Sequence, residues 1–562
     1  MSTSTSIQCR QCSKTFRIEP ADFEFYQRLN VPAPTLCPDC RLQRRLVWRN
    51  ERTLCERSCD LCKKPIIATY PAQTPFLVYC SECWWSSKWD PKEYGRDIDF
   101  TRPFFEQFQE LLQVVPRINL VASNNENSPY VNYANYSANC HMIIGCHHDE
   151  RCLYGWRVME SRDCVDTVQI NQSELCYYSS DLTNCYNVHF SSQVSGSHDG
   201  AYLYDVKGSS NCFLSSNLRN AQYIFKNKQL TAAEYTRAFA QYPLNSYAAQ
   251  QAAWQEYEKL LIGQTIHRAT QAISAVNSSG NNLVNVNNCQ FAFNVQNSEN
   301  SAYVNYSEAV KDAYDCTFSG WPAELLYENL SAGVHSFNVS FGIVCWSCRD
   351  TTYSENCHNS HDLFGCSGLR KAEYSILNKS YEPAVYAALK EKLIAHMRAT
   401  GEYGEFFPAP LSPYAYNETL ANDLFPLTAA QVRQRGWQWL VEDSKATRPA
   451  TATMPDTLEF DEVSLVQQTF SCTSCARSFR LTSAEVAFHQ QTKIALSPLC
   501  SNCRFKQLMS HRTPMAIWQR QCMCTQTDHG HHGLCSTEFP TSYAPERKEL
   551  VYCEACYNQE IY

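Results

Sequence analysis

The chain has 562 residues, a formal net charge of -8, 44% hydrophobic residues and 31 cysteines. This length is enough for several domains whose cores need no disulfides, and the net acidity excludes a protein whose whole surface binds nucleic acid. No run reaches the roughly 18 apolar residues of a membrane helix, and the opening MSTSTSIQCR has no apolar secretory core. We therefore expect a cytoplasmic protein without a membrane partner, in which the cysteines are reduced.

The first predicted elements are two C-x-x-C motifs, Cys9/Cys12 and Cys37/Cys40, separated by 24 residues. The same spacing returns near the other end as Cys472/Cys475 and Cys500/Cys503. Residues between the motifs recur at an offset of 463, namely Phe16, Arg17, Phe25, Gln27, Leu36 and Arg41 as Phe479, Arg480, Phe488, Gln490, Leu499 and Arg504. Two C-x-x-C motifs supply the tetrahedral set of four thiolates that structural Zn²⁺ prefers. We predict zinc ribbons at 1–52 and 466–515 rather than disulfides.

The segment CRQCSKTFRIEPADFEFYQRLNVPAPTLCPDCRLQRRLVWRN resembles the probable zinc-ribbon modules of uncharacterised bacterial proteins. The resemblance lies in the C-x-x-C motif, the aromatic and acidic middle and the CPDCR ending. The longer arrangement, with YCSECWWSSKWDPKEYGRDIDF and LVYCEACYNQEIY, is similar to large cysteine-rich proteins of that group. The resemblance implies zinc and no established activity.

After Cys40 the sequence RLQRRLVWRNER has apolar residues at helical spacing and predicts a short basic amphipathic helix. Its candidate contacts to nucleic acid are Arg41, Arg44, Arg45, Trp48 and Arg49. Clustered guanidinium groups beside an indole suit phosphate contact and base stacking. The alternative is a solvated helix face whose arginines pair with local acids such as Glu51 and Glu56.

A second zinc ribbon is predicted at 53–100, where Cys59/Cys62 and Cys80/Cys83 are separated by 17 residues. Its C-terminal copy, at 516–562, matches it at an offset of 473, so that Cys62, Cys80 and Cys83 correspond to Cys535, Cys553 and Cys556. At this offset Cys59 corresponds to His532, an acceptable Zn²⁺ ligand. Cys522 and Cys524 compete for this position, and His529 and His531 add further candidates. We predict Cys535, Cys553 and Cys556 as ligands, with His532 or Cys524 as the fourth.

The next segment, DFTRPFFEQFQELLQVVPRI, predicts a helix within 101–125 that covers the central region. The centre is duplicated: ENSPYVNY at Glu126 returns as ENSAYVNY at Glu299, and LRNAQYIFKNK at Leu218 returns as LRKAEYSILNK at Leu369. The copies differ in length by 22 residues, about one rung of a parallel β-solenoid. We predict solenoid copies with helical caps at 126–275 and 276–400.

Short units within the copies carry Cys140, Cys152, Cys164 and Cys176 at a spacing of 12. This spacing fits rungs that stack along an axis, with small cysteine side chains in the core. An antiparallel sandwich is the competing fold. The central C-x-x-C, Cys345/Cys348, is a packed thiol pair or a redox dithiol. Residues 401–465 are predicted as a Pro-rich, aromatic segment ending in a flexible linker, EDSKATRPATATMPDT at 442–457.

The predicted architecture is therefore multidomain and mainly β, with terminal zinc ribbons flanking a duplicated parallel β-solenoid with capping helices. We favour a zinc-binding, non-enzymatic scaffold that contacts a protein or nucleoprotein partner, with the basic helix as the nucleic-acid contact. The alternative is a β-helical enzyme acting on a polysaccharide or other polymer, with the ribbons as accessory modules. Its candidate polar clusters are His147/His148/Asp149, His198/Asp199 and His358/His361/Asp362.

Overall fold

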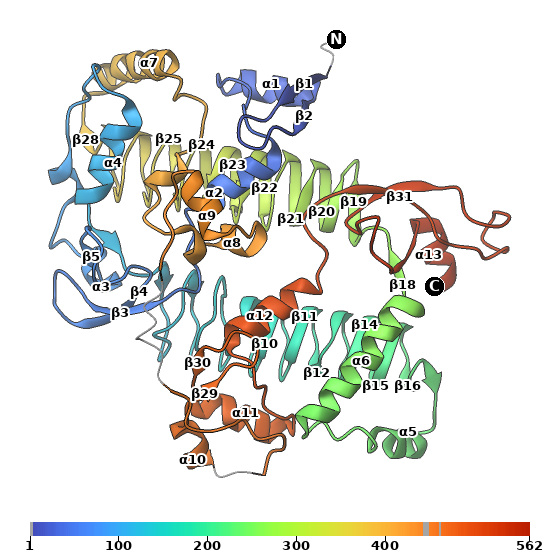
Figure 1. Ribbon diagram of the computed structural model, residues 1–562. Coiled ribbons are helices and arrows are strands. Elements are labelled where there is room, and N and C mark those ends of the chain that lie inside the picture. Colours follow the sequence, from blue (N-terminus) through green and yellow to red (C-terminus); the bar gives the residue numbers. More distant parts are fainter. Residues whose placement is uncertain (1–3, 442–448, 460–461) are drawn as a thin grey trace. The chain divides into compact units, whose positions relative to one another are not determined.

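The computed structural model describes residues 4–441, 449–459 and 462–562, and these form two compact units (Figure 1). Unit 1 consists of Met1–Asn119 and Gln271–Leu440, and unit 2 consists of Leu120–Thr270 and Val441–Tyr562. The N-terminal cysteine modules therefore belong with the second repeat copy, and the C-terminal modules with the first. The predicted linker at 442–457 falls partly on residues 442–448, which lie outside the described residues.

In unit 1 a solenoid, which we call the second solenoid, follows the N-terminal modules. The N-terminal modules contain β1 (Thr5–Gln8), β2 (Thr15–Ile18), α1 (Pro20–Arg28), α2 (Pro38–Leu46), β3 (Cys55–Ser58), β4 (Pro65–Ala68), β5 (Val78–Tyr79), α3 (Ser81–Trp84), η1 (Pro91–Tyr94), α4 (Phe104–Val114) and β6 (Arg117–Ile118). The second solenoid contains β19 (Ala272–Val276), β20 (Gly280–Gln290), β21 (Ala292–Ala302), β22 (Glu308–Thr317), β23 (Gly320–Leu330), β24 (Ser336–Ser340), β25 (Arg349–Thr352), β26 (His361–Phe364), β27 (Glu373–Ile376) and β28 (Lys379–Ser380). The segment after it contains α7 (Pro383–Thr400), η2 (Ala409–Leu411), η3 (Tyr416–Glu418), α8 (Leu420–Leu424) and α9 (Ala429–Gln434).

In unit 2 the first solenoid precedes the C-terminal modules. The first solenoid contains β7 (Ala122–Ser123), β8 (Ala134–Asn135), β9 (Trp156–Met159), β10 (Val165–Asn171), β11 (Tyr177–Thr183), β12 (Tyr186–His189), β13 (Ser192–Ser195), β14 (His198–Lys207), β15 (Ser210–Arg219), β16 (Gln222–Phe225) and β17 (Lys228–Gln229). It is followed by α5 (Ala232–Phe239), α6 (Tyr247–Gly263) and β18 (Ile266–Arg268). The C-terminal modules contain α10 (Glu462–Gln467), β29 (Phe470–Ser471), β30 (Ser478–Phe479), α11 (Ser483–Thr492), α12 (Ser501–Ser510), β31 (Trp518–Gln521), β32 (Glu538–Thr541), β33 (Leu550–Tyr552) and α13 (Glu554–Ile561).

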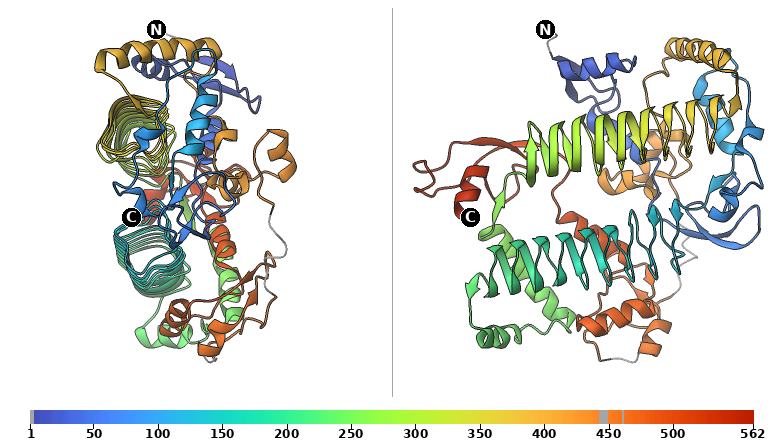
Figure 2. Two further views of the ribbon diagram at one scale, coloured as in Figure 1. Left: turned by 90° about the vertical axis from the view of Figure 1, so that its left-hand side faces the viewer. Right: turned by 180° about the vertical axis from the view of Figure 1, so that it is seen from behind.

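Each solenoid is a stack of coils whose neighbours pair in parallel (Figure 2). Val165 of β10, for example, pairs with Tyr177 of β11, and Gly280 of β20 pairs with Ala292 of β21. The parallel pairing confirms the predicted solenoid and excludes the antiparallel sandwich. Each stack ends in a short antiparallel strand, β17 on β16 in the first solenoid and β28 on β27 in the second. These hairpins cover the last strand edge, which would otherwise invite pairing with another chain.

Every third residue of the coils points inward and is buried, as in the series Cys140, Ile143 and Cys146. At most corners the residue before the inward position has a positive φ, as at Asn139, Met142 and Gly145. Equivalent positions on neighbouring coils are separated by 12 residues along the chain. Because each side of a coil takes three residues, a coil has four sides. Asn and Asp tolerate the left-handed conformation better than other non-glycine residues, and asparagines occupy many of these positions in β20 and β21.

The length of a coil also corrects the predicted relation between the two repeat copies. The sequence predicts that the difference of 22 residues is about one rung, but a coil has 12 residues, so the difference is close to two coils, or 24 residues. In the second solenoid, two coils each contain one additional residue: Val310 pairs with Ala323, and Ala323 with Ser336. The second copy is therefore two coils, or 24 residues, shorter than the first, and its two additional residues reduce the difference to the observed 22.

Helices cover the sides of both solenoids. In unit 1, α4 places the buried Phe104 against Tyr353 and Phe364 of the second solenoid, as expected for a helix that covers the centre. In unit 2, α6 contacts β14 and β15, where Tyr257 donates a hydrogen bond to the Leu203 carbonyl at 2.7 Å. No helix among the described residues is long and apolar enough to cross a membrane.

Candidate metal centres

Three of the predicted four-cysteine sets come together in the structure. They are Cys9/Cys12/Cys37/Cys40, Cys59/Cys62/Cys80/Cys83 and Cys472/Cys475/Cys500/Cys503, and the sulfur atoms of each set lie within 4.8 Å of one another. The Sγ atoms of Cys12 and Cys37 are 3.7 Å apart, and the equivalent pairs in the other two sets are 3.8 Å apart. Four sulfurs about 2.3 Å from a central ion form a tetrahedron with edges of about 3.8 Å. The cysteines of these sets are all free thiols, and their separations match a metal site rather than disulfides.

The same local structure builds these three sites. The first cysteine begins a tight knuckle: the Cys9 amide donates to the Lys14 carbonyl at 2.9 Å, and Ser13, just after the second cysteine, has a φ of 61°. The third cysteine is the N-cap of a helix that carries the fourth cysteine in its first turn, as Cys37 does for α2 and Cys40. The positive end of the helix dipole therefore faces the thiolates and stabilises their charge.

In the fourth set, the sulfur atoms that lie within 4.8 Å of one another are those of Cys522, Cys535, Cys553 and Cys556. The thiol beside the three predicted ligands is therefore that of Cys522, and not Cys524 or the His532 to which the offset of 473 points. The Cys553 amide donates to Cys522 Sγ at 3.1 Å, just as the Cys80 amide donates to Cys59 Sγ at 3.2 Å. Cys522 is therefore the counterpart of Cys59. The chain between Cys522 and Cys535 has ten more residues than the chain between Cys59 and Cys62, and this insertion shifts the alignment. His532 is exposed and belongs to neither ligand group of this module.

The basic helix α2 lies in the interior of unit 1 and does not form a surface for nucleic acid. The five candidate contacts, of which the last two follow α2, are all at most 8% exposed: Arg41, Arg44, Arg45, Trp48 and Arg49. Figure 1 shows α2 against β22 and β23 of the second solenoid. The apolar spacing correctly predicted a helix, but the guanidinium groups face the solenoid, where carboxylates compensate for their loss of water.

One arginine contact is common to both units. Arg41 Nε donates to Asp315 Oδ1 at 2.9 Å, and its guanidinium lies 5.0 Å from the ring of Tyr303. In unit 2, Arg504 of α12 lies 2.7 Å from Asp166 through its Nε atom and 5.0 Å from the ring of Tyr154. Asp166 and Asp315, like Tyr154 and Tyr303, are 149 residues apart. The first cysteine module of each pair therefore docks on its solenoid in the same way.

Unit 1 adds a second layer of buried ion pairs. Arg44 Nη2 donates to Glu328 Oε1 at 2.8 Å, and Arg45 Nη1 donates to Glu328 Oε2 at 3.0 Å. Glu328 is 0% exposed. In unit 2, Gln507 and Leu508 correspond to Arg44 and Arg45 at the offset of 463. Glu328 lies one coil of 13 residues after Asp315, and Tyr178 lies one coil of 12 residues after Asp166, so Tyr178 corresponds to Glu328. The acid is therefore present only in the unit that has the two arginines. Asp315 and Glu328 were not predicted from the sequence, although the repetition of Asp166 as Asp315 at an offset of 149 is a signal that points to Asp315.

No family model matches the chain, and no curated protein matches its sequence.

The three polar clusters considered for an enzyme differ in the burial and in the partners of their side chains. In the first cluster, Asp149 occupies an inward position and is 2% exposed, whereas the exposed His148 stacks on Tyr136 outside the coil. His198 contacts the adjacent Asp199 at 2.9 Å, and His361 lies between the adjacent Asp362 at 2.9 Å and Glu373 at 3.2 Å. His358 is 3% exposed and is held by Asn356.

Asp149 occupies a line of inward positions that otherwise holds small residues, among them Ser137 and Ser161. Burial raises the pKa of Asp149 to about 9, so the folded chain keeps a proton that the unfolded chain releases near pH 4. As the pH rises from about 4 to about 9, this group lowers the free energy of unfolding by about 1.4 kcal/mol per pH unit.

We expect Asp149→Ser to stabilise unit 2, with a gain in the free energy of unfolding that increases as the pH rises over this range. Urea unfolding of variant and wild type at about pH 5.5 and about pH 8 measures it, and an equal gain at both would contradict the burial argument.

The Cys345/Cys348 pair occupies two successive inward positions of the second solenoid, and the two residues are 0% and 1% exposed. Cys345 Sγ donates to the carbonyls of Ile343 and Ser354, the latter at 3.3 Å. The neighbouring Cys348 thiol and burial raise the pKa of Cys345 well above its ordinary value. A buried thiol that keeps its proton is unreactive, so this geometry favours the packed pair over the redox dithiol.

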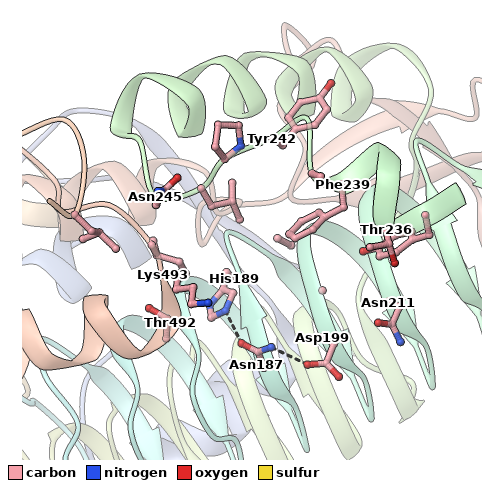
Figure 3. Close-up of a pocket in the computed structure, with 18 of the residues that line it drawn as sticks. Asn187, His189, Asp199, Asn211, Thr236, Phe239, Tyr242, Asn245, Thr492 and Lys493 are labelled. Atoms are coloured by element: carbon pink, nitrogen blue, oxygen red, sulfur yellow. Dashed lines mark hydrogen bonds between the residues drawn. The ribbon is translucent and has the colours of Figure 1, made fainter. Parts of the chain in front are cut away.

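A cavity of about 830 Å³ lies in unit 2 between coils of the first solenoid and the segment from α5 to α6 (Figure 3). On its polar side, Asn187 accepts a hydrogen bond from His189 Nε2 at 2.8 Å and donates to Asp199 Oδ1 at 2.7 Å. Phe239 and Tyr242 lie on the opposite side. Burial lowers the pKa of His189 to about 3, so the imidazole is neutral at pH 7. The cavity offers contacts for a small molecule, but Asn187, His189 and Asp199 already bond to one another.

Proposed function

We propose that the chain is a zinc-binding, non-enzymatic scaffold, in which metal modules of the zinc-ribbon type hold helices against two β-solenoids. The observation that carries this proposal is the recurrence of four closed four-cysteine sets, each with its third cysteine at a helix N-cap. Four thiolates with no open position are typical of structural Zn²⁺, whereas catalytic zinc keeps a position for water or substrate.

The contacts around the metal modules support a scaffold rather than a catalyst. In both units the helix that begins at the third cysteine inserts an arginine into the solenoid surface, Arg41 against Asp315 and Arg504 against Asp166. A bound ion would fix the start of this helix and therefore the position of its arginine. The long solenoid sides that remain uncovered would present a surface to a protein partner in the cytoplasm. Nucleic-acid contact through the basic helix is not part of the proposal, because its arginines already bind carboxylates.

Metal analysis tests the proposal directly. Protein purified without chelator should contain at least about four zinc ions per chain, one for each four-cysteine set. Replacing Cys59 by Ser should remove about one of them, because three thiolates hold Zn²⁺ less tightly than four. Cys55 lies outside every ligand group among the described residues, and Cys55→Ser is the matched control that should keep the full content. A zinc content of about one or none would refute the proposal.

A further inference from the structure

We propose that the last cysteine module, at 516–562, binds a second metal ion through Cys524, His529, His531 and Cys556, with the Cys556 thiolate bridging the two ions. This inference rests on the proposed function, because the same class of metal would fill both sites. The four ligand atoms lie within 4.8 Å of one another, and Cys556 also belongs to the four-cysteine set of this module. Two sulfurs and two imidazole nitrogens form a common tetrahedral set for Zn²⁺.

The donors already face one another in the structure. Cys524 Sγ lies 3.2 Å from His529 Nδ1, and Cys556 Sγ lies 3.4 Å from His531 Nε2. Cys524 and Cys556 are 0% and 1% exposed, and the His529 side chain is 5% exposed. These three donors are therefore shielded from solvent, and His531 is half-buried.

The outer nitrogen of each histidine has an oxygen partner, which is the arrangement of metal-bound histidines. His529 Nε2 lies 3.4 Å from Glu560 Oε2, and His531 Nδ1 lies 3.0 Å from the Gly533 carbonyl oxygen. An imidazole whose outer nitrogen donates its proton to an oxygen leaves a lone pair on the inner nitrogen. Both inner nitrogens face the sulfur atoms, so both lone pairs are directed toward the second site.

Sharing one thiolate makes the number of donors sufficient. Two tetrahedral ions need eight ligand positions, and the module supplies seven donors, of which Cys556 is common to both groups. A single Zn²⁺ held by four thiolates carries excess negative charge. A second Zn²⁺ that brings in only one further thiolate, Cys524, reduces this excess.

The equivalent module in unit 1 is a natural comparison with a single site. Between Cys59 and Cys62 the chain has only Asp60 and Leu61, whereas the chain between Cys522 and Cys535 supplies the additional cysteine and both histidines. The ten-residue insertion therefore brings donors that a single closed four-thiolate site does not use.

Native mass spectrometry of the full chain with zinc alone tests the inference. The wild type should hold about five zinc ions and His529→Ala/His531→Ala about four, whereas the exposed His532→Ala should keep about five. With ¹¹³Cd in place of zinc, two resonances should split each other through the bridging sulfur, and the double variant should lose this splitting.

The possible failures of the two proposals are distinguishable. Four ions in wild type and double variant alike would overturn the second site and leave the proposed function intact. Five ions in the double variant, or two cadmium resonances without mutual splitting, would overturn the assigned ligands or the bridge. One ion or none in the wild type would overturn the proposed function itself. The number of zinc ions in the wild-type chain distinguishes four sites from five by itself. The inference can therefore be overturned even if the double variant does not fold.

Discussion

Replacing Cys37 by Ser should remove one zinc ion and release α2 from the second solenoid. Structural Zn²⁺ contributes on the order of 10 to 16 kcal/mol of apparent binding free energy in small modules, so losing a ligand affects the folding of the whole module. Cys37 is the N-cap of α2, and the buried arginines follow within the same helix. Hydrogen exchange should show loss of protection over residues 38–46 and in β22 and β23, which α2 covers.

The rest of unit 1 and the whole of unit 2 should keep their protection, because the coils of a solenoid are stabilised by their neighbours. Cys500→Ser is the matched variant in unit 2, where it should release α12 from β10 and β11. Cys55→Ser should change neither metal content nor exchange. If Cys37→Ser loses its zinc while α2 stays fully protected, the metal does not hold the helix in place. If the second solenoid also melts completely, it depends on the module for its own folding.

The sequence predicted the solenoid because its coils repeat at a fixed length. The spacing of Cys140, Cys152, Cys164 and Cys176 equals one coil, and all four are buried. The shorter period of three residues was not predicted, because the corners depend on left-handed backbone at residues as different as Asn139 and Met142. Such conformations are set by the stacking of coils rather than by local preference.

The metal ligands and the environment of the basic helix differed in how far they could be predicted. Three four-cysteine sets followed from spacing alone. In the fourth, Cys522 was one of several candidates, because an insertion between Cys522 and Cys535 displaces it from the position that the offset of 473 indicates. For α2 the sequence shows charge but not its partners: Asp315 lies 274 residues from Arg41 along the chain. A basic amphipathic helix has the same sequence pattern whether carboxylates or water surround it, so only the tertiary structure distinguishes the two.

Removing one carboxylate from the buried ion pairs of unit 1 should be strongly destabilising. Glu328→Ala leaves Arg44 and Arg45 buried with fewer partners, and breaking a buried pair in this way costs about 3 to 5 kcal/mol. Asp312→Ala is the control: Asp312 pairs with Arg28 at 3.2 Å, and the Arg28 side chain is 47% exposed. The loss there should be about 0 to 1 kcal/mol. Urea unfolding followed by a probe in unit 1 measures both.

Unit 2 supplies the residues for a sharper form of this test. The triple variant Arg44→Gln/Arg45→Leu/Glu328→Tyr carries the residues found at the corresponding positions, Gln507, Leu508 and Tyr178. Replacing a buried ion pair by uncharged groups of similar volume is often neutral or stabilising. We therefore expect the triple variant to be more stable than Glu328→Ala, although it contains more substitutions. If its loss instead equals or exceeds that of Glu328→Ala, the ion pairs contribute net stability that uncharged packing cannot replace, and the two docking surfaces are not interchangeable.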